Sequence, residues 1–327
     1  MVLRNRVCAA VLFVCIFCLC TGCSGAAHDG RVKLRVVNWN VETFFDAVAD
    51  GDEYGEFAKS KNWNEAAYTA RLTRLASSIK KLNADVVVME EIENEAVVQD
   101  VANFLAGEWN SRRWYRWGCF AKEPGSAIGC AVISRLPLEN LSVHSLDCRS
   151  AEGEQPSLRP VLQLEVVKND RRLTLFVNHW KSMKGGEAET AVWRERQQAL
   201  LERLVSGTLG EAKQPVLCCG DFNMDVEDFQ HDAEGAVVLQ GDGSCTEVRS
   251  PWFAEDGEMV GDGSYMYQGC WSRIDNFFTA GAAEAVDFRP ETDGEWCYED
   301  SGKPKGYKLW TGAGYSDHLP IGVSVLF

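Results

Sequence analysis

Short polar groups follow four apolar, strand-like stretches of the chain, and two more lie near its C-terminus. Their side chains are carboxylates, amides and imidazoles, the residue types that bind hard cations and transfer protons. Carboxylate and amide oxygens favour Mg²⁺, Mn²⁺ or Ca²⁺ over Zn²⁺, and an Asp–His pair can supply protons near neutral pH. The groups are Asn38-Trp39-Asn40, Glu90-Glu91, Asn178-His179, Gly220-Asp221-Phe222-Asn223, Arg273-Ile274-Asp275-Asn276 and Ser316-Asp317-His318.

The segments that precede these groups have the composition of strands. Residues 33–39 are apolar and β-branched, and residues 86–89 and 215–219 are continuous apolar runs typical of strands covered on both faces. Residues 159–167 and 172–180 predict a hairpin around Asn169-Asp170. Because ligands gather at the carboxyl ends of strands in α/β sheets, we expect the polar groups to converge. Further strands are expected at residues 114–120, 127–134, 271–279 and 319–327.

Helices are expected between these strands. Asn62 predicts the start of one helix, because it can cap the first turn and Glu65 follows three residues later. Residues 187–205 predict another helix, and a third is expected after Glu93, whereas residues 225–270 are rich in loops. No repeat or linker follows residue 32, so residues 33–327 are expected to form one domain. The apolar stripe of the first helix is Tyr68, Leu72, Leu75, Ile79 and Leu82.

Residues 46–56 form an acidic segment that contains no lysine or arginine. The spacing of Asp50 and Asp52 resembles the beginning of a calcium-binding loop, but Tyr54 stands at the next ligand position. The pattern therefore fails, and a solvated acidic loop is favoured.

The N-terminus has the pattern of an export signal. Arg4 and Arg6 precede an apolar run of 14 residues, 7–20, too short for the roughly 20 residues of a membrane-spanning helix. The small residues before Cys23 resemble a bacterial lipoprotein processing site. We therefore expect a signal peptide at 1–22, a lipidated Cys23 and a polar tether at 23–32, with ordinary secretion as the alternative. This expectation places the protein outside the cytoplasm, membrane-anchored and facing the periplasm or the cell surface.

Composition and charge exclude several classes of protein. A hydrophobic content of 46% excludes a disordered or collagen-like chain. The 33 basic and 48 acidic residues give a net charge of −15, and no long basic run could wrap nucleic acid by electrostatics alone. A phosphate-bearing substrate would therefore need a bound cation or a local basic cluster.

Eight cysteines follow Cys23, and this even number permits disulfides in an oxidising compartment. Cys218 and Cys219 lie in an apolar run and are interpreted first as small buried residues. No CxxC pair follows residue 23, which argues against a zinc site built on paired thiolates.

In order and context, the polar groups resemble those of the endonuclease/exonuclease/phosphatase superfamily, which has the pancreatic-deoxyribonuclease fold. The acidic segment after the first strand and the string Asn-His-Trp-Lys-Ser at 178–182 are most similar to its secreted bacterial nuclease-like branch. Glu90 departs from the family, which commonly has Gln there, and would add charge beside the metal. The matching segments are residues 37–40, 85–91, 177–180, 220–223, 273–275 and 315–320.

The resemblance implies an α/β fold, a four-layer α/β/β/α sandwich of two packed mixed sheets flanked by helices. It also implies a site for a divalent cation, Mg²⁺ or Mn²⁺, with Ca²⁺ as a further candidate. Glu91 would be the principal ligand, and Asn40 and Asp317 would contribute directly or through water.

The resemblance further implies roles in phosphodiester cleavage. Asp221 would orient or deprotonate the attacking water, and Asn223 would hold a phosphoryl oxygen. His318 would contact the scissile phosphate, with Asp275 fixing its tautomer. His179 would be a second histidine facing the phosphate, able to protonate the leaving oxygen.

Three functions follow as hypotheses. The first is an extracytoplasmic nuclease that cleaves DNA or RNA with a divalent metal; no obligate protein partner is inferred, and the membrane is contacted through Cys23. The second is a sphingomyelinase-like or other phosphate-ester hydrolase, ranked lower because no long exposed apolar hairpin or amphipathic helix is evident. The third is an inactive surface-binding protein, which would have no physical need for the complete set of polar residues.

Overall fold

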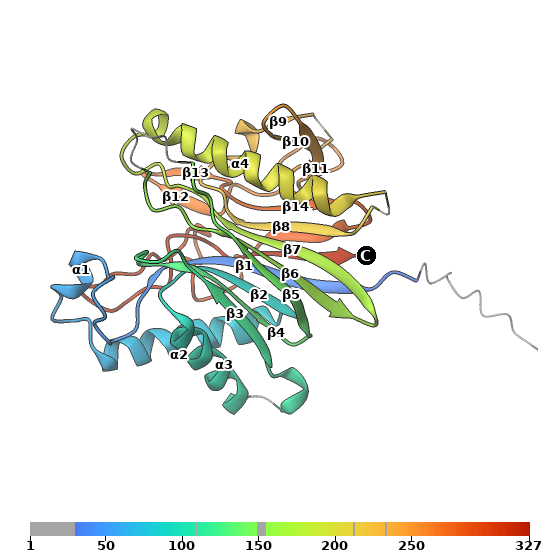
Figure 1. Ribbon diagram of the computed structural model, residues 1–327. Coiled ribbons are helices and arrows are strands. Elements are labelled where there is room, and N and C mark those ends of the chain that lie inside the picture. Colours follow the sequence, from blue (N-terminus) through green and yellow to red (C-terminus); the bar gives the residue numbers. More distant parts are fainter. Residues whose placement is uncertain (1–29, 109, 149–154, 212, 233) are drawn as a thin grey trace, which may run out of the picture. The chain divides into compact units, whose positions relative to one another are not determined.

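Two large β-sheets form the centre of the unit that spans residues 32–327 in the computed structural model (Figure 1). The structure describes residues 30–108, 110–148, 155–211, 213–232 and 234–327. The predicted signal peptide at 1–22, the lipidated Cys23 and the tether up to residue 29 lie outside the described residues. Among the described residues, no helix is long and apolar enough to cross a membrane.

The first sheet has six strands in the order β15-β16-β1-β2-β4-β3. Strand β1 pairs in parallel with β2 and antiparallel with β16. Side chains alternate along β1, so Val36 belongs to the core between the sheets and Val37 packs with the helices on the outer face. The strands are β1 (Lys33–Phe44), β2 (Val86–Ile92), β3 (Trp117–Ala121), β4 (Gly129–Ser134), β15 (Glu284–Pro290) and β16 (Ile321–Leu326).

The second sheet has eight strands in the order β5-β6-β7-β8-β14-β11-β10-β9. Strand β7 is parallel to β8, and β14 is antiparallel to β8. The hairpin predicted around Asn169 and Asp170 is confirmed: both residues have positive φ, 51° and 62°, as a tight hairpin turn requires. The strands are β5 (Leu138–His144), β6 (Val161–Lys168), β7 (Arg171–His179), β8 (Val216–Asp221), β9 (Gln230–His231), β10 (Ala236–Gln240), β11 (Cys245–Arg249) and β14 (Asp275–Ala280).

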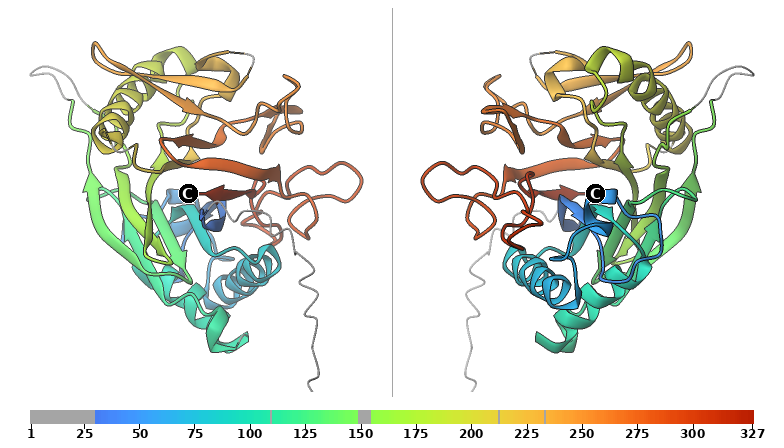
Figure 2. Two further views of the ribbon diagram at one scale, coloured as in Figure 1. Left: turned by 90° about the vertical axis from the view of Figure 1, so that its right-hand side faces the viewer. Right: turned by 90° about the vertical axis from the view of Figure 1, so that its left-hand side faces the viewer.

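Helices cover the outer face of each sheet (Figures 1 and 2). Helices α2 (Glu65–Leu82) and α3 (Glu95–Glu108) pack on the six-stranded sheet, and α4 (Glu187–Leu209) packs on the eight-stranded one. The four-layer α/β/β/α sandwich predicted from the sequence is therefore confirmed. Smaller elements are α1 (Gly55–Ala58), the 3₁₀ turns η1 (Ser111–Arg113) and η2 (Val226–Asp228), and the hairpin of β12 (Tyr265–Tyr267) and β13 (Cys270–Ser272).

The start of α2 corrects one prediction. Asn64, not Asn62, caps the helix, and its side chain accepts a hydrogen bond from the backbone N–H of Ala67. Asn62 lies two residues earlier, and its side-chain amide donates instead to the backbone oxygen of Trp310 at 2.7 Å. Either asparagine could cap the helix by its residue type. The hydrogen bond of Asn62 to the distant Trp310 is a long-range contact that the local sequence does not reveal.

Other elements differ from the prediction in extent. Strands β1 and β2 continue through the polar residues at their ends, because backbone pairing does not depend on side-chain polarity. Strands β5 and β15 were not predicted, and the loop-rich region 225–270 contains several short strands.

The cysteines are thiols rather than disulfides. All eight cysteines after residue 23 lie among the described residues, and all are free. Cys218 and Cys219 are fully buried on β8, as the interpretation of small apolar residues requires. The stability of this unit therefore depends on its two-sheet core.

Candidate active site

Strand register brings three predicted site residues into one row across β7, β8 and β14, at one end of these strands in the eight-stranded sheet. His179, the last residue of β7, is the register partner of Asp221, the last residue of β8. Asp275, the first residue of β14, is the partner of Asp221 on its other side. Because paired residues on neighbouring strands project from the same face, all three side chains meet there.

His318 joins this row from the C-terminal segment. Its Nδ1 donates to Asp275 Oδ2 at 2.8 Å, and its Nε2 lies 4.0 Å from Asp221 Oδ2. His179 Nε2 lies 3.7 Å from the same Asp221 oxygen. Ser264 donates its hydroxyl hydrogen to Asp275 Oδ2 at 2.6 Å and so fixes that carboxylate. The two histidines therefore flank one carboxylate.

The segment that carries His318 is held against β1. The indole Nε1 of Trp39 donates to the backbone oxygen of His318 at 3.0 Å, and the hydroxyl of Ser316 donates to the backbone oxygen of Asn40 at 2.6 Å. The ring of Tyr265 also packs on the imidazole of His318, with centroids 4.5 Å apart. These contacts fix the imidazole over the junction of the two sheets.

Burial and neighbouring charge set the protonation of the row. Burial raises the pKa of Asp221 to about 7, although the charge of His318 opposes this shift. For His318, burial disfavours the charged ring, but the carboxylates around it, Asp275 foremost, together outweigh burial and raise the pKa well above its usual range. Asp221 can therefore bind a proton near neutral pH, while His318 carries a positive charge.

His179 has the opposite protonation. Burial, with the nearby positive charge of Arg159, lowers the pKa of His179 well below its usual range. Its Nδ1 is buried and has no hydrogen-bond partner among the described residues. His179 is thus a neutral imidazole at physiological pH, able to donate a hydrogen bond but not to serve as an imidazolium acid.

Asn40 links this row to the six-stranded sheet. Its side-chain amide donates to Asp221 Oδ2 at 3.0 Å and to Glu91 Oε1 at 3.3 Å. Glu91 reaches this position because its backbone is left-handed, with φ of 64°, at a register shift between β2 and β4. The other oxygen of Glu91 accepts a hydrogen bond from the backbone N–H of Thr43 at 2.6 Å.

Glu42 is a further carboxylate that the sequence analysis did not single out. Its Oε2 accepts backbone hydrogen bonds from Tyr307 at 2.7 Å and from Asp317 at 2.9 Å. Burial and then the charge of Asp317 raise the pKa of Glu42 to about 8, and the charge of Glu91 adds to this rise. The sequence signal that could have identified Glu42 is the alternation of polar residues along β1, at Asn38, Asn40 and Glu42. Glu42 is thus hydrogen-bonded to the Asp317 backbone and close enough to Glu91 for their charges to interact.

The donor set fits a hard divalent cation. Glu42, Glu91 and Asp317 concentrate carboxylates beside the Asn40 amide. Burial is the main cause of the raised pKa of Glu42, and the charges of Asp317 and Glu91 add repulsion. A bound cation would relieve this repulsion, and oxygen donors suit Mg²⁺, Mn²⁺ or Ca²⁺. Asp221, Asp275 and His318 also place ligand atoms within 4.8 Å of one another. Since His318 is hydrogen-bonded to Asp275, we interpret that group as a proton-transfer network.

The environment of Glu90 opposes the negative charge that the sequence analysis expects at this position. Its side chain is fully buried, accepts a hydrogen bond from Asn38 at 3.3 Å, and has its pKa raised well above the usual range by burial and by the charges of Asp275 and Asp221. A protonated Glu90 is neutral and isosteric with the Gln common in the family. Burial therefore opposes the extra charge that the sequence predicts beside the metal.

Asn223 borders an open pocket of about 510 Å³ next to the row. Its backbone is left-handed, with φ of 47°, and its N–H donates to Asp221 Oδ1 at 2.8 Å. The side-chain amide donates to the backbone oxygen of Trp180 at 3.2 Å. The pocket is lined by Ser182, Met183, Lys184, Asn223, Tyr265, Tyr267, Ser272 and Ile274.

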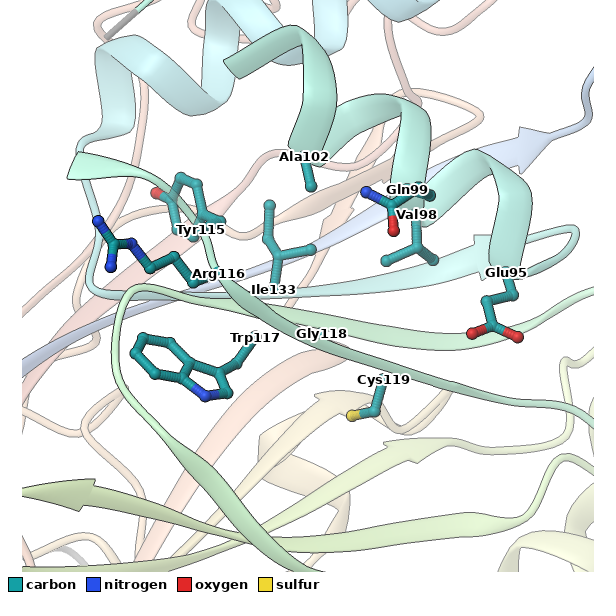
Figure 3. A pocket seen from close by; sticks show the side chains of 10 residues that line it. All are labelled: Glu95, Val98, Gln99, Ala102, Tyr115, Arg116, Trp117, Gly118, Cys119 and Ile133. Atoms are coloured by element: carbon teal, nitrogen blue, oxygen red, sulfur yellow. The ribbon is translucent and has the colours of Figure 1, made fainter. Parts of the chain in front are cut away.

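A different pocket lies between α3 and β3 (Figure 3). It has a volume of about 220 Å³, and Glu95 and Arg116 stand toward opposite ends of its lining. None of the eight predicted site residues lines it. The structure thus brings those eight residues together at the sheet junction and leaves this second pocket separate from them.

Comparison with solved structures shows the same fold in proteins of low sequence identity. Truncated TDP2 from Caenorhabditis elegans is 14% identical over 90% of this chain and 98% of its own, with a TM-score of 0.59. TDP2 from D. rerio complexed with a single-strand DNA product is 16% identical over 90% and 98%, with a TM-score of 0.55. The human Nocturnin catalytic domain with a bound sulfate anion is 16% identical over 90% and 97%, with a TM-score of 0.54.

A comparison with curated proteins returns no match. The model of the endonuclease/exonuclease/phosphatase family, in contrast, matches residues 35–326, from the first strand to the last. The match covers both sheets and every polar group of the site. The chain therefore belongs to the endonuclease/exonuclease/phosphatase family and is a metal-dependent phosphodiester hydrolase.

Proposed function

We propose that this enzyme is a nuclease that cleaves DNA or RNA. The observation that carries the proposal is the pocket that begins at Asn223 and Tyr265, directly beside His318. Tyr267 is 60% exposed on its rim and lies parallel to Tyr265, at an interplanar angle of 7°. An exposed ring can stack on a base, and Lys184 can contact a phosphate, so the pocket suits a nucleic-acid strand. The single-strand DNA product in the similar D. rerio structure supports this choice.

The proposed reaction is attack of water on phosphorus with release of an alcohol oxygen. Asp221, with a pKa of about 7, accepts the proton of the attacking water. Asn40 donates a hydrogen bond to Asp221 and orients this carboxylate toward the cleft. The Asn223 backbone donates to the other oxygen, and the remaining lone pairs of the carboxylate stay available for the water.

Charge on the phosphoryl oxygens increases in the transition state, and three side chains are placed to stabilise it. His318 supplies an imidazolium, kept protonated by Asp275. His179 supplies a neutral N–H donor, and Asn223 supplies an amide. We assign the leaving-group proton to His318 rather than to His179, because only His318 has a raised pKa.

Glu91, Asn40 and Asp317 are the residues proposed to hold the divalent cation. A bound Mg²⁺ or Mn²⁺ supplies Lewis-acid stabilisation of a phosphoryl oxygen. Glu42 keeps the Asp317 backbone in place, so it positions this set.

We also propose that the enzyme acts outside the cytoplasm as a lipoprotein. The support is the N-terminal sequence, in which a short apolar run ends at Cys23 and is followed by small polar residues. A tether at residues 23–32 would leave the catalytic domain free to meet polymeric substrates near the membrane.

A substrate panel tests the nuclease proposal. Purified protein is incubated with supercoiled plasmid, single-stranded DNA, RNA, sphingomyelin vesicles and a chromogenic phosphate ester, each with Mg²⁺ or Mn²⁺ and with chelator. We expect cleavage of a nucleic acid that stops with chelator. Faster turnover of sphingomyelin or of the phosphate ester under matched conditions would replace the nuclease proposal by the corresponding alternative.

The matched control for this panel is a pair of histidine variants. His318→Ala should reduce nuclease activity by about a hundredfold, because a transition-state donor is lost. His144→Ala, on the edge strand β5, should retain activity. Unchanged activity in His318→Ala would show that the measured nuclease is a contaminant, and equal loss in both variants would show that the variants are misfolded.

A further inference from the structure

Two segments far apart in sequence bring three carboxylates together away from the proton-transfer row. Asp50 and Glu53 belong to the loop after β1, and Glu93 directly follows the end of β2. Each offers a carboxylate oxygen, and these oxygens all lie within 4.8 Å of one another. Like charges at this separation repel, so a cation among them would stabilise the arrangement.

Glu93 gives the independent indication of such a cation. Its side chain is only 1% exposed, and its Oε2 accepts a hydrogen bond from the backbone N–H of Asp46 at 2.5 Å. Its Oε1 is buried and has no hydrogen-bond partner among the described residues. A buried carboxylate oxygen without a partner is unfavourable, and a cation beside it would satisfy it.

No basic side chain fills this role in the described part of the chain. None of the three carboxylates forms an ion pair with a described residue, and Lys122, which reaches the loop, lies 3.7 Å from Asp52 Oδ2 instead. Asp46 is also engaged, because its Oδ2 accepts a hydrogen bond from Asn94 at 3.0 Å. The negative charge of the three carboxylates therefore remains uncompensated.

The loop is already folded around these side chains. The two oxygens of Glu53 accept hydrogen bonds from the backbone N–H groups of Asp50, at 2.6 Å, and Gly51, at 3.0 Å. Gly51 has φ of 102°, a conformation that a residue with a side chain rarely adopts. Ordering the ligands would thus require little further change of the backbone.

We propose that Asp50, Glu53 and Glu93 bind a Ca²⁺ ion at a second, structural site. Oxygens that share one Ca²⁺ at roughly 2.3–2.6 Å lie at most about 5 Å apart, and the observed separations satisfy this limit. An exposed loop that keeps water as further ligands suits Ca²⁺, which tolerates irregular coordination better than Mg²⁺ does. The ion would fasten the loop to the end of β2, two residues after Glu91.

This site differs from the loop pattern that the sequence suggested. Asp52, the second residue of that pattern, pairs with Lys122, and Tyr54 supplies no carboxylate. The third carboxylate comes from Glu93, 40 positions after Glu53, so a linear motif could not contain it.

Calorimetric titration of Ca²⁺ into chelator-treated full-length protein tests the site. The titration is made in the Glu91→Gln background, which weakens the proposed catalytic metal site and leaves the three ligands intact. We expect Ca²⁺ binding in this protein, together with a rise in melting temperature. Adding Asp50→Asn and Glu53→Gln should weaken the binding by at least about tenfold, because two charged ligands are lost.

Asp52→Asn is the matched control, since it removes a charge from the same loop but spares the ligands, and it should bind Ca²⁺ nearly as well as its parent. Asp50 and Glu53 are on the surface loop, so their variants are expected to fold, which circular dichroism checks. Glu93→Gln provides a second test, at the residue that follows β2. Ca²⁺ binding that persists in the Asp50/Glu53 double variant, or no binding up to about 5 mM in its parent, would overturn the proposal.

Discussion

Asp221 and His318 have complementary protonation states although both are buried. Burial alone would make both groups neutral, but Asp275 keeps His318 charged and raises the pKa of Asp221. A charged acid and a titratable base can therefore exist together near neutral pH. This is the arrangement that water attack on a phosphodiester requires, since one proton must be removed and another supplied.

Asp275→Asn tests this dependence through the pH profile. Without the carboxylate the pKa of His318 falls, so the alkaline limb of kcat/KM should move to lower pH, and the maximal rate should fall by about a hundredfold. Removal of the charge also lowers the pKa of Asp221, so the acidic limb should move in the same direction. The profile is measured at saturating Mg²⁺.

Ser264→Ala is the control for that variant, because it removes the hydrogen bond to Asp275 but keeps the charge. Its two limbs should stay where the parent has them, with a smaller loss of rate. An unchanged alkaline limb in Asp275→Asn would show that His318 does not depend on this carboxylate.

At the scale of elements, the end of β1 and the start of the following loop are held by α2. Buried Arg71 donates hydrogen bonds to the backbone oxygens of Thr43 at 2.9 Å and Val41 at 3.0 Å, and to that of Glu42. Glu42 and Thr43 have positive φ, 52° and 45°, which is unfavourable for residues with side chains. Arg71 therefore stabilises the strained segment whose Thr43 N–H binds Glu91.

Arg71→Met should lower the free energy of unfolding by about 3 kcal/mol, because buried carbonyl groups lose their donor. It should also raise the Mg²⁺ concentration needed for half-maximal activity, since the Glu91 carboxylate is less well fixed. Urea unfolding and a metal titration measure the two effects.

Lys80→Met on the exposed face of α2 is the control. Lys80 forms a surface ion pair with Glu108 at 2.8 Å, so its loss should change stability by no more than about 0.5 kcal/mol. If Arg71→Met changed stability no more than this control, the guanidinium would not support the segment.

At the scale of the whole molecule, the site is the seam between two sheets. Asn40 and Glu91 come from the six-stranded sheet, His179 and Asp221 come from the eight-stranded one, and a hydrogen bond from Asn40 to Asp221 crosses the seam. The chain as a whole has a net charge of −15, so it repels a polyanion at long range. Substrate capture must therefore depend on local cations and on pocket contacts.

The proposed membrane anchor also belongs to this scale and is tested on the intact chain in bacteria. A fatty-acid analogue should label the wild-type protein, and the protein should sediment with membranes. Cys23→Ala should abolish the label, because the thiol that carries the lipid is removed, while Cys245→Ala on exposed β11 should keep it. Label that survives Cys23→Ala would refute the anchor.

The amino-acid sequence by itself determined the class of the fold and the inventory of the site. Apolar runs, helical periodicity and the Asn169-Asp170 turn depend on local backbone preference, so they were readable without coordinates. Most of the eight site residues stand out because they lie at the ends of apolar, strand-like runs, where ligands gather in α/β sheets, and the order of their motifs resembles that of a known family.

Only the tertiary structure decided how these residues are aimed and charged. A left-handed backbone turns Glu91 toward Asn40, and complete burial holds the pKa of Glu90 high. Glu93 meets Asp50 and Glu53 through contacts between distant segments. Register shifts, desolvation and long-range neighbours depend on the whole packed molecule, and no window of sequence contains them.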